Sequence, residues 1–236
     1  MSPATLRRLH RQIGLACSLT VLLATGSGLL HVVMTWTQPP PPRPEPAGAF
    51  APEVAIFPIG SLPADLAPLR SLQLVTVDGR PWYQAFPVQG APRYFSAVDG
   101  GEDASLETAH ALEIARRHLG SARLAPEAFA YSRRLDAYDD EYVAIFRLLP
   151  VHRVDVADGR GTRLYVSTVS GSVARHTDDG RQFEASLFSL FHKYSFIPHK
   201  PTRDLVLVAF TALAFLASLA GIALFVATRP GRAARR

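Results

Sequence analysis

Cysteine is almost absent from this chain: Cys17 is the only one among 236 residues, and it lies inside a long apolar segment. Disulfides within the chain and CxxC metal or redox motifs are therefore excluded. The HExxH motif, phosphate-binding glycine loops and the G-x-S-x-G elbow of serine hydrolases are missing as well. Hydrolysis and nucleotide chemistry thus have no motif in the sequence, and whether the chain catalyses a reaction stays open.

Charged side chains are missing from two long segments, at about 13–36 and 205–228. Each has roughly 20 apolar residues or more, the length that a helix needs to cross a hydrocarbon core of about 30 Å. The outer flanks of both segments are basic, with Arg7, Arg8, Arg11, Arg229, Arg232, Arg235 and Arg236. Because basic flanks stay in the cytoplasm, we predict two transmembrane helices, both termini inside, and residues 38–200 outside. The first segment is longer than the apolar part of a signal peptide, which favours an uncleaved anchor.

Acidic residues are absent from both ends of the chain. All 20 lie between the apolar segments, together with 18 of the 25 Lys and Arg residues. The middle of the chain is therefore slightly acidic, and the net charge of +5 comes from the flanks. A basic groove interleaved with aromatic residues is missing too, so we expect no nucleic-acid partner.

The middle of the chain alternates short strand patterns with one clear helix. The helix is predicted from Ser105 as N-cap to Gly120 as C-cap, because apolar residues recur at helical spacing between them. A short helix broken by prolines is predicted at 62–72. The predicted strands are 72–77, 81–88, 93–98, 142–148, 151–156, 163–168 and 172–176, with Asp78-Gly79 as a hairpin turn.

The predicted organisation follows from these patterns. Residues 93–100 resemble residues 163–171, since both form an alternating strand that ends in a polar-glycine turn. We therefore expect an α+β domain with a helix on antiparallel sheet, made of two related units and anchored by two transmembrane helices. The predicted segments are a cytoplasmic N-terminus (1–12), a first span (13–36), a proline-rich linker (37–56), the outer domain (57–182), an interfacial amphipathic helix (183–201), a second span (202–228, capped by Thr202) and a cytoplasmic tail (229–236).

Three stretches together resemble one family. Leu9–Gly14 reads LHRQIG and precedes a span that ends in ATGSG, which is similar to the LHRWxG…TG opening of PepSY-associated transmembrane proteins. Leu164–Val173 resembles the PepSY pattern lYVDxxTGxv, and Phe191–Phe196 is similar to LHxWDFL before a second span. The sequence departs from these patterns at Ser167, where the family usually has Asp, and at Ser170, where it often has Thr.

The resemblance implies a bacterial inner-membrane protein with a PepSY-like α+β domain in the periplasm. Larger relatives carry haem between their spans and act as reductases of iron-siderophore complexes, whereas PepSY domains elsewhere bind or inhibit peptidases. For this chain, the resemblance therefore implies either haem b and a ferric or siderophore reductase component, or a partner protein or peptide in the periplasm.

Four histidines lie at the predicted membrane boundaries and are the candidate cofactor-binding residues: His10, His31, His192 and His199. A bis-histidine haem needs two neutral imidazoles on opposite faces of the porphyrin. His31 and His192 both lie at the outer end, so they are the candidate haem-iron ligands. Histidines are also comfortable as interfacial anchors that hold no metal. His10 has no partner on the second span, and a site there requires a homodimer.

Two functions of different class remain open at this point. The first is an accessory role in iron or haem handling, with haem held between the spans. The second is a haem-free module that binds a protein or peptide at a sheet edge. The small faces Ala214/Ser218 and Ala217/Gly221 are expected to let the second span pack closely on the first or on another copy.

Overall fold

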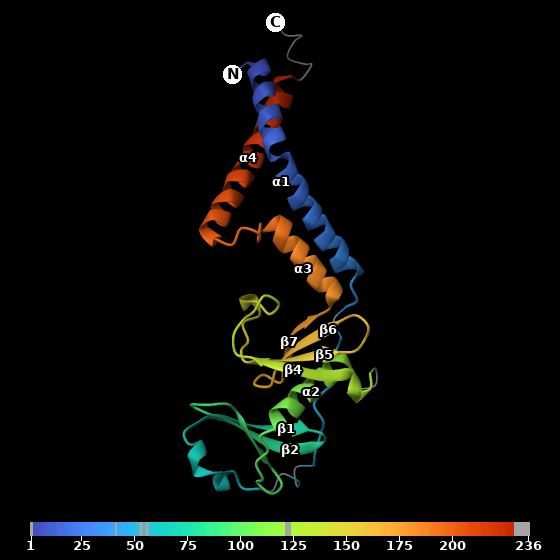
Figure 1. Cartoon of the computed structure of the whole chain (residues 1–236), viewed down its shortest axis with the longest axis vertical. Helices are drawn as coiled ribbons and strands as arrows, with labels where there is room; N and C mark the ends of the chain where they lie inside the picture. The colour runs from blue at the N-terminus through green and yellow to red at the C-terminus, as the bar shows by residue number, and fades with distance from the viewer. Residues whose placement is uncertain (1, 41, 52–53, 55–56, 121–123, 229–236) are drawn as a thin grey trace. The chain divides into compact units, whose positions relative to one another are not determined.

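The computed structural model describes residues 2–40, 42–51, 54, 57–120 and 124–228. It divides the chain into two compact units. Unit 1 consists of Met1–Pro39 and Arg181–Arg236, and unit 2 is Pro40–Gly180. Figure 1 shows long helices in the first unit, and the second contains a three-stranded and a four-stranded sheet with a helix that connects them. The predicted cytoplasmic tail at 229–236 lies outside the described residues.

The first sheet of unit 2 is a three-stranded antiparallel meander in the order β1-β2-β3. Its strands are β1 (Leu69–Val77), β2 (Arg80–Pro87) and β3 (Arg93–Ser96). The turn between β1 and β2 has φ of 48° at Asp78 and 73° at Gly79. Two consecutive positive φ angles define the type I′ turn, which matches the twist of paired strands, and the predicted Asp-Gly hairpin is confirmed.

The second sheet of unit 2 is a four-stranded antiparallel meander in the order β4-β5-β6-β7. Its strands are β4 (Phe129–Leu135), β5 (Val151–Val156), β6 (Thr162–Ser167) and β7 (Ser172–Thr177). The sequence patterns predict β5, β6 and β7, and the structure confirms these three strands. The α+β character of the fold is confirmed with them, because both sheets are antiparallel and are joined by a helix.

Helix α2 (Leu106–Leu119) connects the two sheets and packs on both. Ala111, Ile114 and Ala115 are buried on the second sheet, in a cluster completed by Phe129, Val154, Val156, Leu164 and Val166. Leu106, in the first turn, packs instead with residues of the first sheet, Val77 and Tyr94. The helix therefore buries side chains on more than one side, which joins the two meanders into one domain.

One predicted strand and one predicted helix are wrong. Residues 142–148 contain only the 3-10 turn η5 (Ala144–Phe146), because the Asp139 carboxylate accepts hydrogen bonds from the backbone N–H groups of Glu141 and Tyr142. The Tyr142 hydroxyl then donates to the Leu148 carbonyl and closes the loop. The predicted helix at 62–72 is replaced by the turn η3 (Ala64–Leu66) and the first residues of β1, and the turn η2 (Ile59–Ser61) precedes it. Pro63 and Pro68 interrupt helical hydrogen bonding there.

Two predicted helix caps differ from the structure. Ser105 precedes α2 but has helical backbone angles, and its hydroxyl donates to the Asp103 carboxylate instead of accepting from the helix. The second long helix begins at Lys200, so His199 is its N-cap and Thr202 lies inside its first turn. In both cases a polar neighbour holds the side chain that the sequence assigns to the cap.

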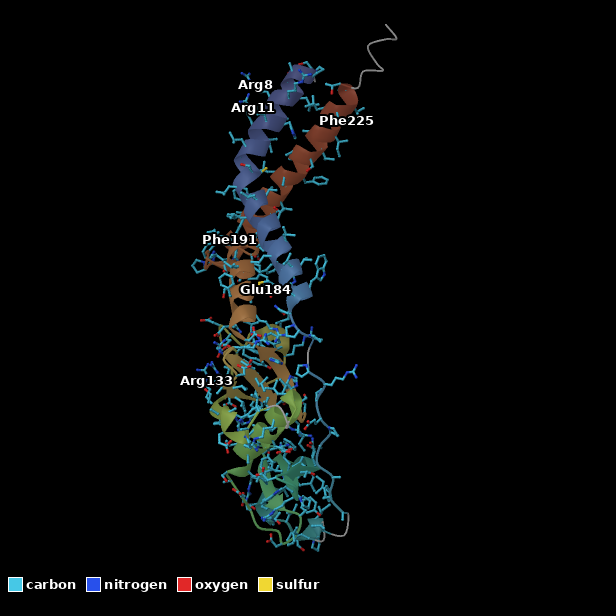
Figure 2. The ribbon with its side chains drawn as sticks, turned by 90° about the vertical axis from the view of Figure 1, so that its right-hand side faces the viewer. Arg8, Arg11, Arg133, Glu184, Phe191 and Phe225 are labelled. Atoms are coloured by element: carbon cyan, nitrogen blue, oxygen red, sulfur yellow. The ribbon has the colours of Figure 1, made fainter. Side chains whose placement is uncertain are left out.

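Unit 1 contains three helices, α1 (Pro3–Thr37), α3 (Asp179–His192) and α4 (Lys200–Ala227), of which α3 starts at the end of unit 2. Helices α1 and α4 are long and apolar enough to cross a membrane. Figure 2 shows Arg8 and Arg11 on the side of α1 that faces away from α4. The two long helices predicted from the sequence are thereby confirmed as helices.

Small residues form the contact between α1 and α4. Cys17 and Ala217 are buried there, at 3% and 8% exposure. A Cβ atom added to Gly221 would lie 3.1 Å from the His10 ring, so the backbone of α4 approaches that ring closely. The predicted Ala217/Gly221 face thus packs on the first long helix, as small-residue faces do between apolar helices.

Candidate functional site

The first candidate histidine, His31, is tied to helix α3 by a carboxylate. Its Nδ1 is hydrogen-bonded to Glu184, whose side chain is 13% exposed while that of His31 is 53% exposed. The second oxygen of Glu184 accepts from the Gln38 amide at 3.3 Å, and the Gln38 oxygen accepts from Arg181 Nε at 3.2 Å. Figure 2 shows Glu184 on α3, beside α1. A chain of four side chains therefore holds the start of α3 against the end of α1.

The second candidate histidine, His192, ends α3 and also contacts α1. Its Nδ1 lies 3.3 Å from the carbonyl oxygen of Ala24, so Nδ1 carries the proton and donates it. The Phe188 ring stacks on the His192 ring with centroids 4.4 Å apart, and it lies 5.4 Å from the His31 ring. The Phe188 ring thus contacts both candidate ligands, of which His31 belongs to α1 and His192 contacts α1 at Ala24.

The position of His192 along α1 tests whether His31 and His192 fit one haem. Ala24 precedes His31 by seven residues, which corresponds to about 10 Å along an α-helix. Two axial imidazoles of one iron approach it to about 2 Å each, as metal-bound imidazoles do. The observed packing, with Phe188 against both rings, therefore does not fit a single iron shared by these two histidines.

The other two candidate histidines lie elsewhere in unit 1. His10 donates from Nδ1 to the Ala217 carbonyl at 2.9 Å, in the contact of α1 with α4. His199 caps α4, and its Nδ1 lies 2.7 Å from the Thr202 hydroxyl. The four predicted residues are not gathered into one site. Within the described part of the chain, no group of three or more His, Cys, Asp or Glu side chains is arranged to hold a metal ion.

Unit 2 contains a buried polar cluster that the sequence analysis missed. Glu107 in the first turn of α2 lies 3.2 Å from His152 Nε2 and 3.1 Å from Arg134. Burial alone raises the pKa of Glu107, but its hydrogen bond and ion pair with His152, with Arg134 beside them, outweigh burial and lower it. The spacing of Glu107 and His110 on the inner face of one helix was the available signal in the sequence.

The second half of this cluster connects the two sheets. The Tyr94 hydroxyl lies 3.1 Å from His110 Nδ1, and the Gln84 amide donates to that hydroxyl at 2.8 Å and to the Thr168 carbonyl at 3.2 Å. Gln84 belongs to β2, whereas Thr168 directly follows β6. Burial lowers the pKa of His110 to about 4, so its ring is neutral at pH 7. These hydrogen bonds join the two sheets, while the buried Gln84 Oε1 has no hydrogen-bond partner among the described residues.

The first sheet has an edge strand with exposed apolar side chains. Strand β1 pairs with β2 on one side only, and no strand among the described residues pairs with its other side. Leu69 and Leu74 on β1 are 37% and 45% exposed. The opposite edge, β3, is partly covered because the backbone N–H of Ser96 donates to the Gly101 carbonyl and Phe95 forms a bridge with Glu102. The β1 edge is therefore the more open one in this sheet.

Side-chain contacts within each unit hold the candidate residues in place. In unit 1 the Glu184 carboxylate is bonded to His31 and Gln38, and in unit 2 the Glu107 carboxylate is bonded to His152 and Arg134. Comparison with known protein families, curated proteins and solved structures finds no match to this chain. The molecule thus has two apolar helices and two antiparallel sheets, and its likeness to other proteins adds nothing further.

Proposed function

We propose that this chain is a bacterial inner-membrane protein that crosses the membrane twice and uses unit 2 as an accessory binding domain on the periplasmic face. The two apolar helices support this proposal by their length and composition. The basic flank at the N-terminus supports a cytoplasmic start, and the PepSY resemblance gives the same location. A homodimer in the membrane stays a prediction.

The observation that carries the binding role is the open edge of β1. An edge strand presents unpaired backbone groups, and an extended peptide can add to it as a further strand. The exposed Leu69 and Leu74 supply apolar contacts for alternate side chains of such a peptide. We therefore propose that unit 2 binds an extended segment of a periplasmic protein along β1.

Site-specific photo-crosslinking tests this proposal. A photoreactive phenylalanine analogue in place of Leu74 should crosslink to extended segments of partner proteins, and Leu74→Lys should abolish their binding. Leu148 is the matched control, because it is 39% exposed and lies outside both sheets. Equal crosslinking from position 148, or unchanged binding by Leu74→Lys, would show that the β1 edge is not the binding surface.

A second proposed function is haem handling, and one observation favours it. The Nδ1 atoms of His31 and His192 are both hydrogen-bonded, and a histidine that binds a metal through Nε2 makes such a bond from Nδ1. Because the two rings do not fit one iron in this packing, the proposal also requires α3 to shift along α1. Haem, when bound, would supply one-electron chemistry.

The visible spectrum of the full-length protein separates the two functions. Protein produced with ample haem should show a Soret band, with sharp bands on reduction that are lost in His31→Ala and in His192→Ala. His199→Ala is the matched control for a boundary histidine. Folded protein with a flat visible spectrum would exclude haem binding and leave the β1 edge as the proposed function.

A further inference from the structure

Two histidines of unit 2 meet at the end of helix α2. His118 lies in the last turn of α2, and His176 lies on the edge strand β7. His118 Nε2 and His176 Nδ1 are 3.3 Å apart, and the ring centroids are 5.3 Å apart with an interplanar angle of 75°. The sequence separates these residues widely, so only the packing of α2 on the second sheet brings them together.

The separation of the two nitrogens equals that of two ligands on one metal ion. Imidazole nitrogens bind zinc at about 2.0–2.1 Å, so two nitrogens 3.3 Å apart subtend an angle of about 105–110° at the ion. That angle is the tetrahedral one. Without an ion, the same distance lets one ring N–H donate to the nitrogen of the other ring. The pair therefore has the spacing of a chelate.

The surroundings hold both rings in place. Ile114 and Ala115 on α2 are buried against the second sheet, and His176 pairs in register with the fully buried Leu164 of β6. The two histidines thus stand on elements whose relative position is set by a packed core. Little conformational entropy remains to be lost when an ion binds, which favours binding.

The end of α2 carries positive charge as well as helix carbonyl groups, because Arg116 and Arg117 lie in its last turn with His118. The last carbonyl groups of a helix carry a partial negative charge, and His118 lies among them. His118 also lines a hollow of about 180 Å³ together with Glu45 and Ser172, which gives water access to the remaining coordination positions.

We propose that His118 and His176 form a two-imidazole site for a divalent late first-row metal ion, Cu²⁺ or Zn²⁺. Imidazole suits these ions, whereas Mg²⁺ and Ca²⁺ prefer oxygen ligands. Binding requires the proton between the two rings to move to the other nitrogen of its own ring, so no proton is released overall. Water completes the coordination. The site is independent of the binding roles proposed above.

The test uses the full-length protein in detergent, with any affinity tag removed and without added haem. One equivalent of Cu²⁺ is added, pulsed electron paramagnetic resonance counts the coordinated imidazoles, and a titration with Zn²⁺ competition gives the affinities. His118→Gln and His176→Gln each remove one ligand. His199→Gln is the control, because it removes an exposed histidine from a different unit.

The wild type should show two coordinated imidazoles, each ligand variant should show one, and the affinity should fall roughly tenfold or more. His199→Gln should bind like the wild type. A wild-type signal from fewer than two imidazoles, unchanged affinity in both ligand variants, or an equal loss in His199→Gln overturns the site. If a variant does not fold, protection of His118 and His176 from carbethoxylation by Zn²⁺ in the wild type decides, and equal labelling with and without Zn²⁺ refutes the proposal.

Discussion

Acidification should weaken the folding of unit 2 through His110. This histidine is 3% exposed, and burial, followed by the charges of Arg117 and His152, lowers its pKa from 6.5 to about 4, while Glu107 opposes them. Because the folded state disfavours the proton, stability is complete above pH 6.5 and is lost as the pH falls toward 4. The full effect is about 3 kcal/mol, of which about 2 kcal/mol is lost between pH 7.5 and pH 5.

Urea unfolding of the full-length protein at several pH values measures this loss. Trp82 packs beside the cluster of Val77, Tyr94 and Leu106, so its fluorescence reports unit 2. Trp36, in α1, is replaced by Phe to remove the second signal. The unfolding free energy of unit 2 should then fall by about 2 kcal/mol between pH 7.5 and pH 5.

His110→Asn is the decisive variant, because Asn keeps a polar atom near the position of Nδ1 but does not titrate. It should be less stable than the parent at pH 7.5, by about 1–3 kcal/mol, since it leaves space around Tyr94. Its stability should change far less between pH 7.5 and pH 5, and burial of His118, whose pKa is also lowered, accounts for the remainder. A pH dependence in His110→Asn equal to that of the parent refutes the reasoning.

Two further predictions concern the same unit. Glu107→Gln should destabilise unit 2 by about 2–4 kcal/mol in urea unfolding at pH 7.5, because it removes the carboxylate that faces His152 in a buried pair. A loss of stability below about 0.5 kcal/mol would show that the pair contributes little. Gly100→Ala should cost about 1–3 kcal/mol more than Gly90→Ala. Both glycines have positive φ, but a Cβ at Gly100 would overlap the Phe57 ring, whereas the one at Gly90 meets open space. Equal thermal midpoints for the two glycine variants contradict this.

Short sequence patterns were sufficient to predict the elements whose conformation depends mainly on their own residues. The Asp78-Gly79 turn, helix α2 and strand β5 are specified by short stretches, and each was predicted. The loop at 142–148 was not, because the Asp139 carboxylate competes for its backbone N–H groups, and the apolar residues alone resemble a strand. Strand β4 was missed for the opposite reason: its outward positions are charged or polar, and its apolar ends pack into two different clusters.

The candidate sites depend on packing that a sequence does not display. The sequence places His31 and His192 at the same predicted boundary, but the register of α3 on α1 decides their separation, and Glu184 and Gln38 set that register. In unit 2, by contrast, packing brings together two residues that the sequence does not place together. His118 and His176 belong to unrelated patterns, and they meet only because α2 packs across the second sheet.

The hydrogen bond between Arg181 and Gln38 joins the two places where the chain leaves and re-enters unit 1. Unit 2 is therefore an insertion whose two ends are held together by its host. Contacts between α1 and α3, rather than contacts within the sheets, then offset the entropy lost when the two ends of unit 2 are brought together. It follows that a domain put in place of unit 2 needs ends as close together as Gln38 and Arg181.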